Sequence, residues 1–224
     1  MIGLLGMIGV GVTILIAGRP QLKKYLLVVM IILLVLLAMR TMVRNANWSD
    51  AITLYKNDIK IQDDYNKRDG LGVEFIYEGK FEQALTQIQK SVKMNPYYAN
   101  VNDLGVVYQH MGNREKAKEY YARAIKLNPT LLSPYINYAT ILVLYDDPKD
   151  AVPIIKNQLI KNHPDVSRFW LLLAIAEYKL HDEDSALESA QGAYSLSIDM
   201  QTQYVLSFIT KKRPINELNV ALLE

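Results

Sequence analysis

The chain has 224 residues, with 25 basic and 23 acidic side chains, so its formal net charge is only +2. A charge this small, with bases and acids interspersed along most of the chain, argues against a nucleic-acid partner. The sequence contains no cysteine, which excludes disulfides, thiolate nucleophiles and cysteine-ligated metals.

The N-terminal 43 residues are apolar and contain two uncharged segments, residues 2–18 and 25–39. A bilayer core is crossed by about 20 apolar helical residues. Lys23, Lys24 and Arg40 can lengthen the second segment by reaching toward the headgroups. The sequence predicts a transmembrane helical hairpin over residues 1–43, with spans at 2–18 and 25–43. A buried helix pair in a water-soluble fold and a secretory signal are the alternatives.

The link between the two predicted spans carries Arg19, Lys23 and Lys24, whereas the far flank carries Arg40 and Arg44. The positive-inside rule places the more basic side in the cytoplasm. We therefore expect an integral membrane protein that contacts lipid through its N-terminal spans. Its remaining domain is expected outside the cytoplasm.

A repeated pattern begins after residue 64. A large and a small residue form pairs at 71–72, 104–105, 138–139 and 173–174. An alanine follows each small residue by 12 positions, at residues 84, 117, 151 and 186. Prolines close the first three units at residues 96, 129 and 164, with spacings of 33 and 35 residues. A fixed period of this length indicates stacked helical hairpins.

This pattern resembles the tetratricopeptide repeat (TPR) family over residues 65–198. The resemblance implies two antiparallel helices per unit, in which a small residue such as Gly105 meets an alanine such as Ala117 at the helix crossing. The fold class expected is all-α: the transmembrane hairpin is followed by a right-handed TPR α-solenoid. That solenoid has about four repeats, a half-repeat and a capping helix.

The predicted domains follow from these patterns. Residues 1–43 form the transmembrane hairpin, and residues 44–64 form a junction and half-repeat helix that includes Trp48 and Tyr55. Residues 65–198 form four TPR units. Residues 199–224 form a capping helix, with Tyr204, Val205 and Phe208 facing inward, and a loosely held tail.

The junction has a second resemblance, in the sequences Arg44-Asn45, Trp48-Ser49-Asp50 and Thr53-Leu54-Tyr55. It is similar to the segment that joins the last span to the repeats in transmembrane and TPR-containing O-mannosyltransferases and their bacterial relatives. That class catalyses with an acidic pair in an early loop among many spans, which two spans cannot provide. The chain is then either a stand-alone anchored repeat protein or the C-terminal part of a transferase.

The residues that often carry catalysis occur at turns and helix starts. His110, His163 and His181 lie in different units and form no ligand cluster. The acidic runs at 63–64, 146–147 and 182–184 are placed where carboxylates cap helices. We therefore predict no catalytic residue, no cofactor, no metal and no small-molecule substrate.

Helix A of each TPR unit lines the inner groove of the solenoid, and that groove is where the resemblance implies that a partner binds. A clamp for a C-terminal carboxylate is not expected, because apolar or acidic residues hold most of its positions. A mixed apolar and amide groove would take an extended segment or a helix of a protein. The candidate groove residues are Asn66, Asp69, Asn102, Asp103, Gln109, His110, Ser133, Asn137, Thr140, Arg168 and Tyr178.

The function expected is that of a non-catalytic, membrane-anchored scaffold for protein–protein interaction. The first alternative is a C-terminal fragment or accessory subunit of a multi-span protein glycosyltransferase. The second is a repeat protein that assembles with copies of itself.

Overall fold

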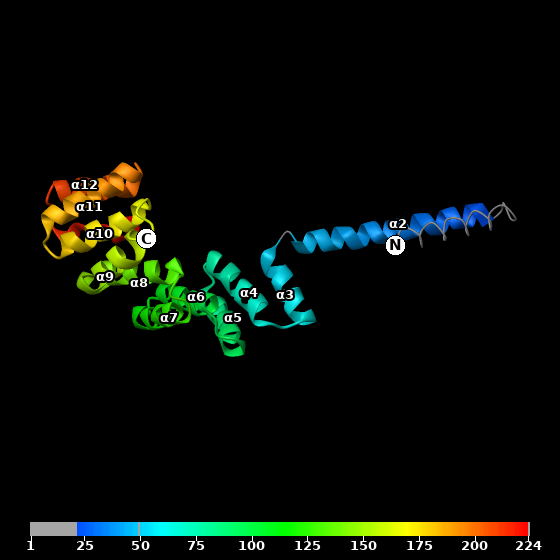
Figure 1. Ribbon diagram of the computed structural model, residues 1–224. Coiled ribbons are helices and arrows are strands. Elements are labelled where there is room, and N and C mark those ends of the chain that lie inside the picture. The colour runs from blue at the N-terminus through cyan, green and yellow to red at the C-terminus, as the bar shows by residue number, and fades with distance from the viewer. Residues whose placement is uncertain (1–21, 49, 224) are drawn as a thin grey trace. The chain divides into compact units, whose positions relative to one another are not determined.

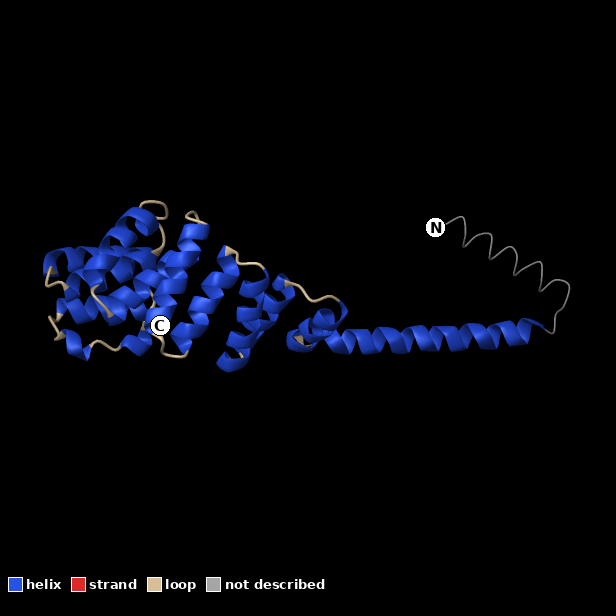
Figure 2. Cartoon of the chain, turned by 90° about the horizontal axis from the view of Figure 1, so that it is seen from below, coloured by secondary structure: helices blue, strands red, loops and turns tan. Residues whose placement is uncertain are grey.

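The structure is a computed structural model that describes residues 22–48 and 50–223. These residues form helices, turns and loops, with no strand among them (Figure 2). The chain divides into two compact units, residues 1–57 and 58–224. The elements are α2 (Leu22–Trp48), α3 (Ala51–Ile61), α4 (Tyr65–Tyr77), α5 (Phe81–Met94), α6 (Tyr98–His110), α7 (Arg114–Leu127), α8 (Leu132–Tyr145), α9 (Pro148–Ile154), the π-helix η1 (Ile155–Ile160), α10 (Ser167–Lys179), α11 (Glu183–Leu196), α12 (Met200–Thr210) and two 3₁₀ turns, η2 (Ile215–Glu217) and η3 (Val220–Leu222).

Helix α2 contains the uncharged stretch from Tyr25 to Met39. The large apolar side chains described in this stretch are all at least 47% exposed. None of the helices within residues 22–48 and 50–223 is both long enough and apolar enough to cross a membrane. The predicted span at 25–43 is therefore not confirmed, and the predicted span at 2–18 lies outside the described residues.

The predicted half-repeat at the junction is divided between two helices. Helix α2 continues to Trp48, and α3 begins at Ala51. Asp50 starts α3, because its carboxylate accepts hydrogen bonds from the backbone N–H groups of Ile52 (3.1 Å) and Thr53 (3.3 Å). Trp48 thus belongs to the helix before the break, not to the half-repeat helix in which the sequence pattern placed it.

Residues 65–196 form four helical hairpins that follow one another along the second unit (Figure 1). The pairs are α4 with α5, α6 with α7, α8 with α9 and η1, and α10 with α11. Both helices of a hairpin pack on helix A of the next hairpin, so that the apolar face of one hairpin is buried by its neighbours.

Each hairpin is built around a close approach of its two helices. A Cβ atom added to Gly105 would lie 2.6 Å from Cε1 of Tyr121 and 3.3 Å from the carbonyl oxygen of Ala117. At Gly72 an added Cβ would lie 2.2 Å from Cγ1 of Ile88. The partner alanines of all four hairpins, at residues 84, 117, 151 and 186, are fully buried. The predicted meeting of small residues at the helix crossing is confirmed in the first two hairpins.

Carboxylates cap three helices where the acidic runs predicted caps, and two further helices begin with caps that the sequence analysis did not single out. Asp64 accepts from the backbone N–H of Lys67 at 3.0 Å, and Asp182 accepts from that of Ser185 at 3.2 Å. Asn113, Asp147 and Asp199 cap α7, α9 and α12 in the same way. Such caps satisfy backbone donors that the helix itself leaves unbonded.

The third hairpin departs from the regular pattern. Its second helix contains Pro153 and passes into the π-helix η1. Beside it, the carboxylate of Glu177 is almost fully buried and is bonded by Lys156 of η1 (2.9 Å) and by the hydroxyl of Ser189 of α11 (2.7 Å). A buried carboxylate needs such partners, so these contacts tie η1, α10 and α11 together.

The C-terminal segment consists of α12 and the residues that follow it. Val205 and Phe208 of α12 are buried as expected, whereas Tyr204 is half-buried and its hydroxyl accepts from the backbone N–H of Asn219 at 2.8 Å. The amide of Gln201 donates to the carbonyl of Leu222 at 2.8 Å. These two bonds connect the residues after α12 to that helix.

Candidate functional site

The second unit contains a hollow of about 420 Å³ that spans three consecutive A helices. Helices α6, α8 and α10 contribute to its wall, together with the turn after α6 and two residues of α7. We call it the basic hollow. It is lined by Val106, Gln109, His110, Gly112, Arg114, Tyr121, Asn137, Thr140, Tyr145 and Arg168.

The predicted groove residues that share this hollow are Gln109, His110, Asn137, Thr140 and Arg168. They come from helix A of three different units, as expected for a groove that runs across the repeats.

Side-chain hydrogen bonds fix the polar groups of the hollow. The hydroxyl of Tyr121 donates to Oε1 of Gln109 at 2.7 Å. The amide of Asn137 donates to Oδ1 of Asn102 at 3.2 Å, which joins α8 to α6. The hydroxyl of Thr140 donates to the carbonyl of Ile136 at 2.8 Å. These bonds hold the amides of the hollow in defined orientations.

The hollow is lined by two arginines and a histidine. The ring of His110 stacks on that of Phe81 with centroids 4.8 Å apart. The guanidinium of Arg114 lies 3.8 Å from the ring centroid of Tyr145, a cation–π geometry. Arg168 is exposed at the start of α10. The ten lining residues include no Asp or Glu.

A carboxylate–amide cluster lies beside the hollow, on α4 and α6. The hydroxyl of Tyr97 donates to Oδ2 of Asp69 at 2.7 Å, and the amide of Asn102 donates to Oδ1 of Asp103 at 3.1 Å. Asp69 is only 6% exposed, and its Oδ1 has no hydrogen-bond partner among the described residues. The cluster is connected to the hollow by the bond between Asn102 and Asn137.

Burial changes the acidity of this cluster. It raises the pKa of Asp69, although the hydrogen bond from Tyr97 opposes the shift. The pKa of Asp103 rises to about 7, because the side chain is desolvated and the charge of Asp69 is near; the bond from Asn102 acts in the opposite direction. Burial, together with the charge of Asp103, also raises the pKa of Tyr121.

Three predicted groove residues lie outside both sets. Asn66 and Ser133 are exposed and line none of the three hollows described for the second unit. Tyr178 packs its ring on Phe208 of α12, with centroids 5.8 Å apart, and its hydroxyl donates to the carbonyl of Arg213 at 2.8 Å. The last hairpin is covered there by the C-terminal segment, so Tyr178 has a packing role.

Sequence reasoning missed four side chains of the hollow: Val106, Arg114, Tyr121 and Tyr145. Arg114 is the first residue of α7, and Tyr121 belongs to the same helix B. The prediction used only selected positions of helix A and left out helix B. The turn Gly112-Asn113 brings the start of helix B to the rim of the hollow. That turn was readable in the sequence as the link between the two helices.

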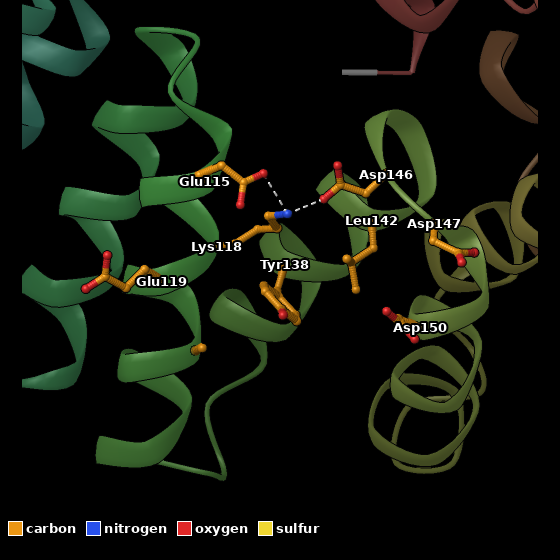
Figure 3. A pocket seen from close by; sticks show the side chains of 9 residues that line it. Glu115, Lys118, Glu119, Tyr138, Leu142, Asp146, Asp147 and Asp150 are labelled. Carbon is orange, nitrogen blue, oxygen red and sulfur yellow. Dashed lines mark hydrogen bonds and ion pairs between the residues drawn. The ribbon is translucent and has the colours of Figure 1, made fainter.

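A second hollow, of about 590 Å³, lies between α7, α8 and α9 and has the opposite charge (Figure 3). We call it the acidic hollow. Lys118 bridges two of its carboxylates: Nζ lies 2.9 Å from Glu115 and contacts Asp146 more closely. Both contacts raise the pKa of Lys118. It is lined by Glu115, Lys118, Glu119, Ala122, Tyr138, Leu142, Asp146, Asp147 and Asp150.

Neither hollow offers the geometry of a metal centre. Within residues 22–48 and 50–223, no group of three or more His, Cys, Asp or Glu side chains is arranged to hold a metal ion.

Comparisons with known proteins agree with this architecture. Two tetratricopeptide-repeat family models match the chain, one over residues 102–131 and one over residues 146–200. No curated protein matches the chain in sequence.

Solved structures of TPR proteins have the same fold. MamA (residues 41 to the end) from Desulfovibrio magneticus RS-1 is 18% identical, with a TM-score of 0.60 over 73% of this chain and 85% of that one. YrrB, described as a TPR protein with an unusual peptide-binding site, is 15% identical, with a TM-score of 0.61 over 77% of this chain and 87% of that one. A thermophilic TPR protein from Thermus thermophilus is 19% identical, with a TM-score of 0.54 over 66% of this chain and 82% of that one.

These comparisons bear on the two resemblances noted in the sequence. They give no support to the relationship with O-mannosyltransferases. Both segments matched by the repeat models lie within the second unit, where the structure has stacked helical hairpins. The chain therefore contains tetratricopeptide repeats, and its second unit is an all-helical solenoid built from them.

Proposed function

We propose that this protein is a non-catalytic scaffold whose repeat groove binds a segment of a protein partner. The observation that carries the proposal is the basic hollow, which spans helix A of three successive hairpins. Amide and hydroxyl groups line it beside the apolar Val106, and such a surface suits the backbone and side chains of a peptide segment. The description of YrrB as a peptide-binding TPR protein adds support by analogy of fold.

The binding groove is tested by a double variant, Asn102→Ala with Asn137→Ala. These amides bond to each other at 3.2 Å across α6 and α8, and Asn137 lines the hollow. A matched control changes Asn66 and Ser133 to Ala, because both are exposed polar residues of A helices outside the hollow. Tagged full-length chains would be used to recover partners, and recovered proteins would be quantified.

The expected result is that the double variant loses the specific partner and the control keeps it. Retention of every specific partner by the double variant, with unchanged affinity, would contradict the groove assignment. Sedimentation of the full chain tests the alternative of self-assembly. If a copy of the chain is the partner, the protein sediments as an oligomer.

We also propose that the N-terminal unit attaches the protein to a lipid bilayer, with the repeats outside the cytoplasm. The support is the uncharged stretch from Tyr25 to Met39, whose described apolar side chains are exposed around the helix. The 15 residues of that stretch rise about 22 Å as a helix, and flanking basic residues can extend their reach. Neutral apolar surface of this kind is stabilised by contact with lipid tails.

Flotation of the full chain with lipid vesicles tests the attachment. Leu33→Arg with Leu34→Arg places two charges in the uncharged stretch and is expected to abolish flotation. Flotation that persists in this variant would contradict attachment through α2. Because the sequence has no cysteine, single cysteines at Gln21 and Asn113 report the side by labelling of intact cells. Labelling of position 113 alone is expected.

A further inference from the structure

The charge of the basic hollow identifies the chemistry that it accepts. His110, Arg114 and Arg168 line it, and no acid does. Neither arginine is ion-paired with a carboxylate of the described residues, although Arg68 and Arg213 each have such a partner, Asp63 and Glu217. Two guanidinium groups therefore border one hollow without a compensating negative charge on the chain.

The position of Arg114 is fixed by its surroundings. Its guanidinium lies over the ring of Tyr145 at 3.8 Å. Arg114 also lines a hollow of about 470 Å³ whose wall includes Glu115 and Asp146. Both of those acids already contact Lys118. The positive charge of Arg114 thus remains available on the side of the basic hollow.

The basic hollow also offers neutral hydrogen-bond donors. Oε1 of Gln109 is occupied by the hydroxyl of Tyr121, which leaves the amide N–H groups of Gln109 without a partner among the described residues. A carboxylate that enters the hollow can accept hydrogen bonds from this amide and from the forked N–H groups of an arginine. Hydrogen bonds between charged groups of this kind are stronger than those between neutral groups.

We propose that the basic hollow holds a side-chain carboxylate, an Asp or Glu within the bound segment of the partner. This inference rests on the proposed function and names the residue type that the groove selects. Asp103 is linked to the hollow by the hydrogen bonds from Asn102 to Asp103 and from Asn137 to Asn102, and Asp69 lies near enough for its charge to act on Asp103. Where these carboxylates are ionised they repel further negative charge, so the segment selected is expected to carry an isolated acid and not an acidic run.

The test uses the full chain and a library of random nonapeptides that are acetylated at the N-terminus and amidated at the C-terminus. The amide removes the terminal carboxylate, so any acid selected is a side chain. Peptides retained by the wild-type chain are sequenced. The best peptide is then remade with Gln in place of its acid, and the dissociation constants of both are measured for each variant.

The variants are Arg168→Gln, Arg168→Glu and Arg123→Gln. Arg168 is exposed and has no described hydrogen bond or ion pair, so its replacement does not disturb the fold. Arg123 is an exposed arginine of α7 outside the hollow and serves as the matched control. Thermal unfolding of each variant verifies that the fold is retained.

The expected result is an Asp or Glu enriched at one library position with no acid beside it. Arg168→Gln is expected to bind the acidic peptide about 10-fold more weakly and the Gln peptide unchanged. Arg168→Glu is expected to shift the selection toward Lys or Arg at that position. Arg123→Gln is expected to match the wild type.

Other outcomes overturn one proposal or both. Enriched peptides without an acid preference, or equal affinity of the acidic and Gln peptides, disprove the carboxylate site and leave peptide binding intact. Retention of no peptide by the wild-type chain, whether amidated or with a free C-terminus, contradicts the proposed function itself. Peptides that bind only with a free C-terminus would assign the hollow to a terminal carboxylate. If inorganic phosphate binds the chain while the selected peptides show no preference for an acid, the basic hollow is a site for a free anion.

Discussion

The hydroxyl of Tyr121 lies 2.7 Å from Oε1 of Gln109, and the same tyrosine ring fills the space that a side chain at Gly105 would need. One residue of helix B therefore sets both the spacing of the second hairpin and the orientation of an amide in the basic hollow. Tyr121 therefore contributes both to the packing of the second hairpin and to the hydrogen bonding of the basic hollow.

Gly105→Ala is expected to destabilise the protein. The added Cβ would meet Cε1 of Tyr121 at 2.6 Å, which forces the ring or the helices to move. Overpacking of this kind costs about 1–3 kcal/mol of unfolding free energy. Urea unfolding measures it, with Gly192→Ala as the control.

At Gly192 an added Cβ would lie 3.6 Å from the ring of Trp170, which is ordinary contact. Alanine is favoured over glycine in a helix, so this change should stabilise the protein by about 0.5–1 kcal/mol. Equal effects of the two substitutions would contradict the role of Gly105 in helix approach.

Tyr121→Phe removes the hydroxyl and keeps the ring. Oε1 of Gln109, which is half-buried, loses its donor, and we expect a loss of about 1 kcal/mol in unfolding free energy together with weaker binding of the partner segment. Tyr120→Phe is the control, because its ring stacks on Tyr108 and its hydroxyl has no described hydrogen bond. A Tyr121→Phe variant that matches the control in both measurements would show that the bond has no role.

Asp103 should make stability depend on pH. Burial raises its pKa to about 7, above the value of about 4 that an unfolded chain has. Below the unfolded pKa the side chain is protonated in both states and has no effect. As the pH rises toward 7 the unfolded state loses its proton first, so the folded state becomes less stable relative to it.

The wild type is therefore expected to lose stability between pH 5 and pH 8, and Asp103→Asn to lose about 2 kcal/mol less over that range. Urea unfolding at both pH values measures the difference. Asp64→Asn is the control, because the pKa of Asp64 is shifted in the opposite direction from that of Asp103. Hydrogen bonds from Lys67 lower the pKa of Asp64, so its removal should destabilise the protein at both pH values. An unchanged pH slope in Asp103→Asn would contradict the buried position of this acid.

The repeats could be predicted because their spacing depends on local geometry. The small residue approaches the alanine 12 positions later in the first two hairpins, and both members of the pair are buried in the last two, since a tight turn between two helices brings such positions together. The helix caps were predictable for the same reason, because a cap involves residues three positions apart. The π-helix in the third hairpin depends on packing around Pro153 and had no comparable local pattern.

The groove was predicted in part. Gln109, Asn137 and Arg168 share one hollow because the same register positions of successive A helices face one side of a solenoid. Tyr178 follows that register but is covered by Phe208 and Arg213, since the chain after the last repeat folds back over it. Arg114 was missed because a turn, not helix periodicity, brings it to the hollow.

The central claim is that the repeat groove binds a segment of a protein partner, and site-specific photocrosslinking tests it most directly. A photoreactive amino acid would replace Val106 or Arg168 in the basic hollow, Asp150 in the acidic hollow, or Gln203 on α12. The account predicts that positions 106 and 168 crosslink to one and the same short segment of a partner, as mapped by mass spectrometry, and that positions 150 and 203 do not. Equal crosslinking from all four positions, or none from positions 106 and 168 while the partner is bound, would contradict it.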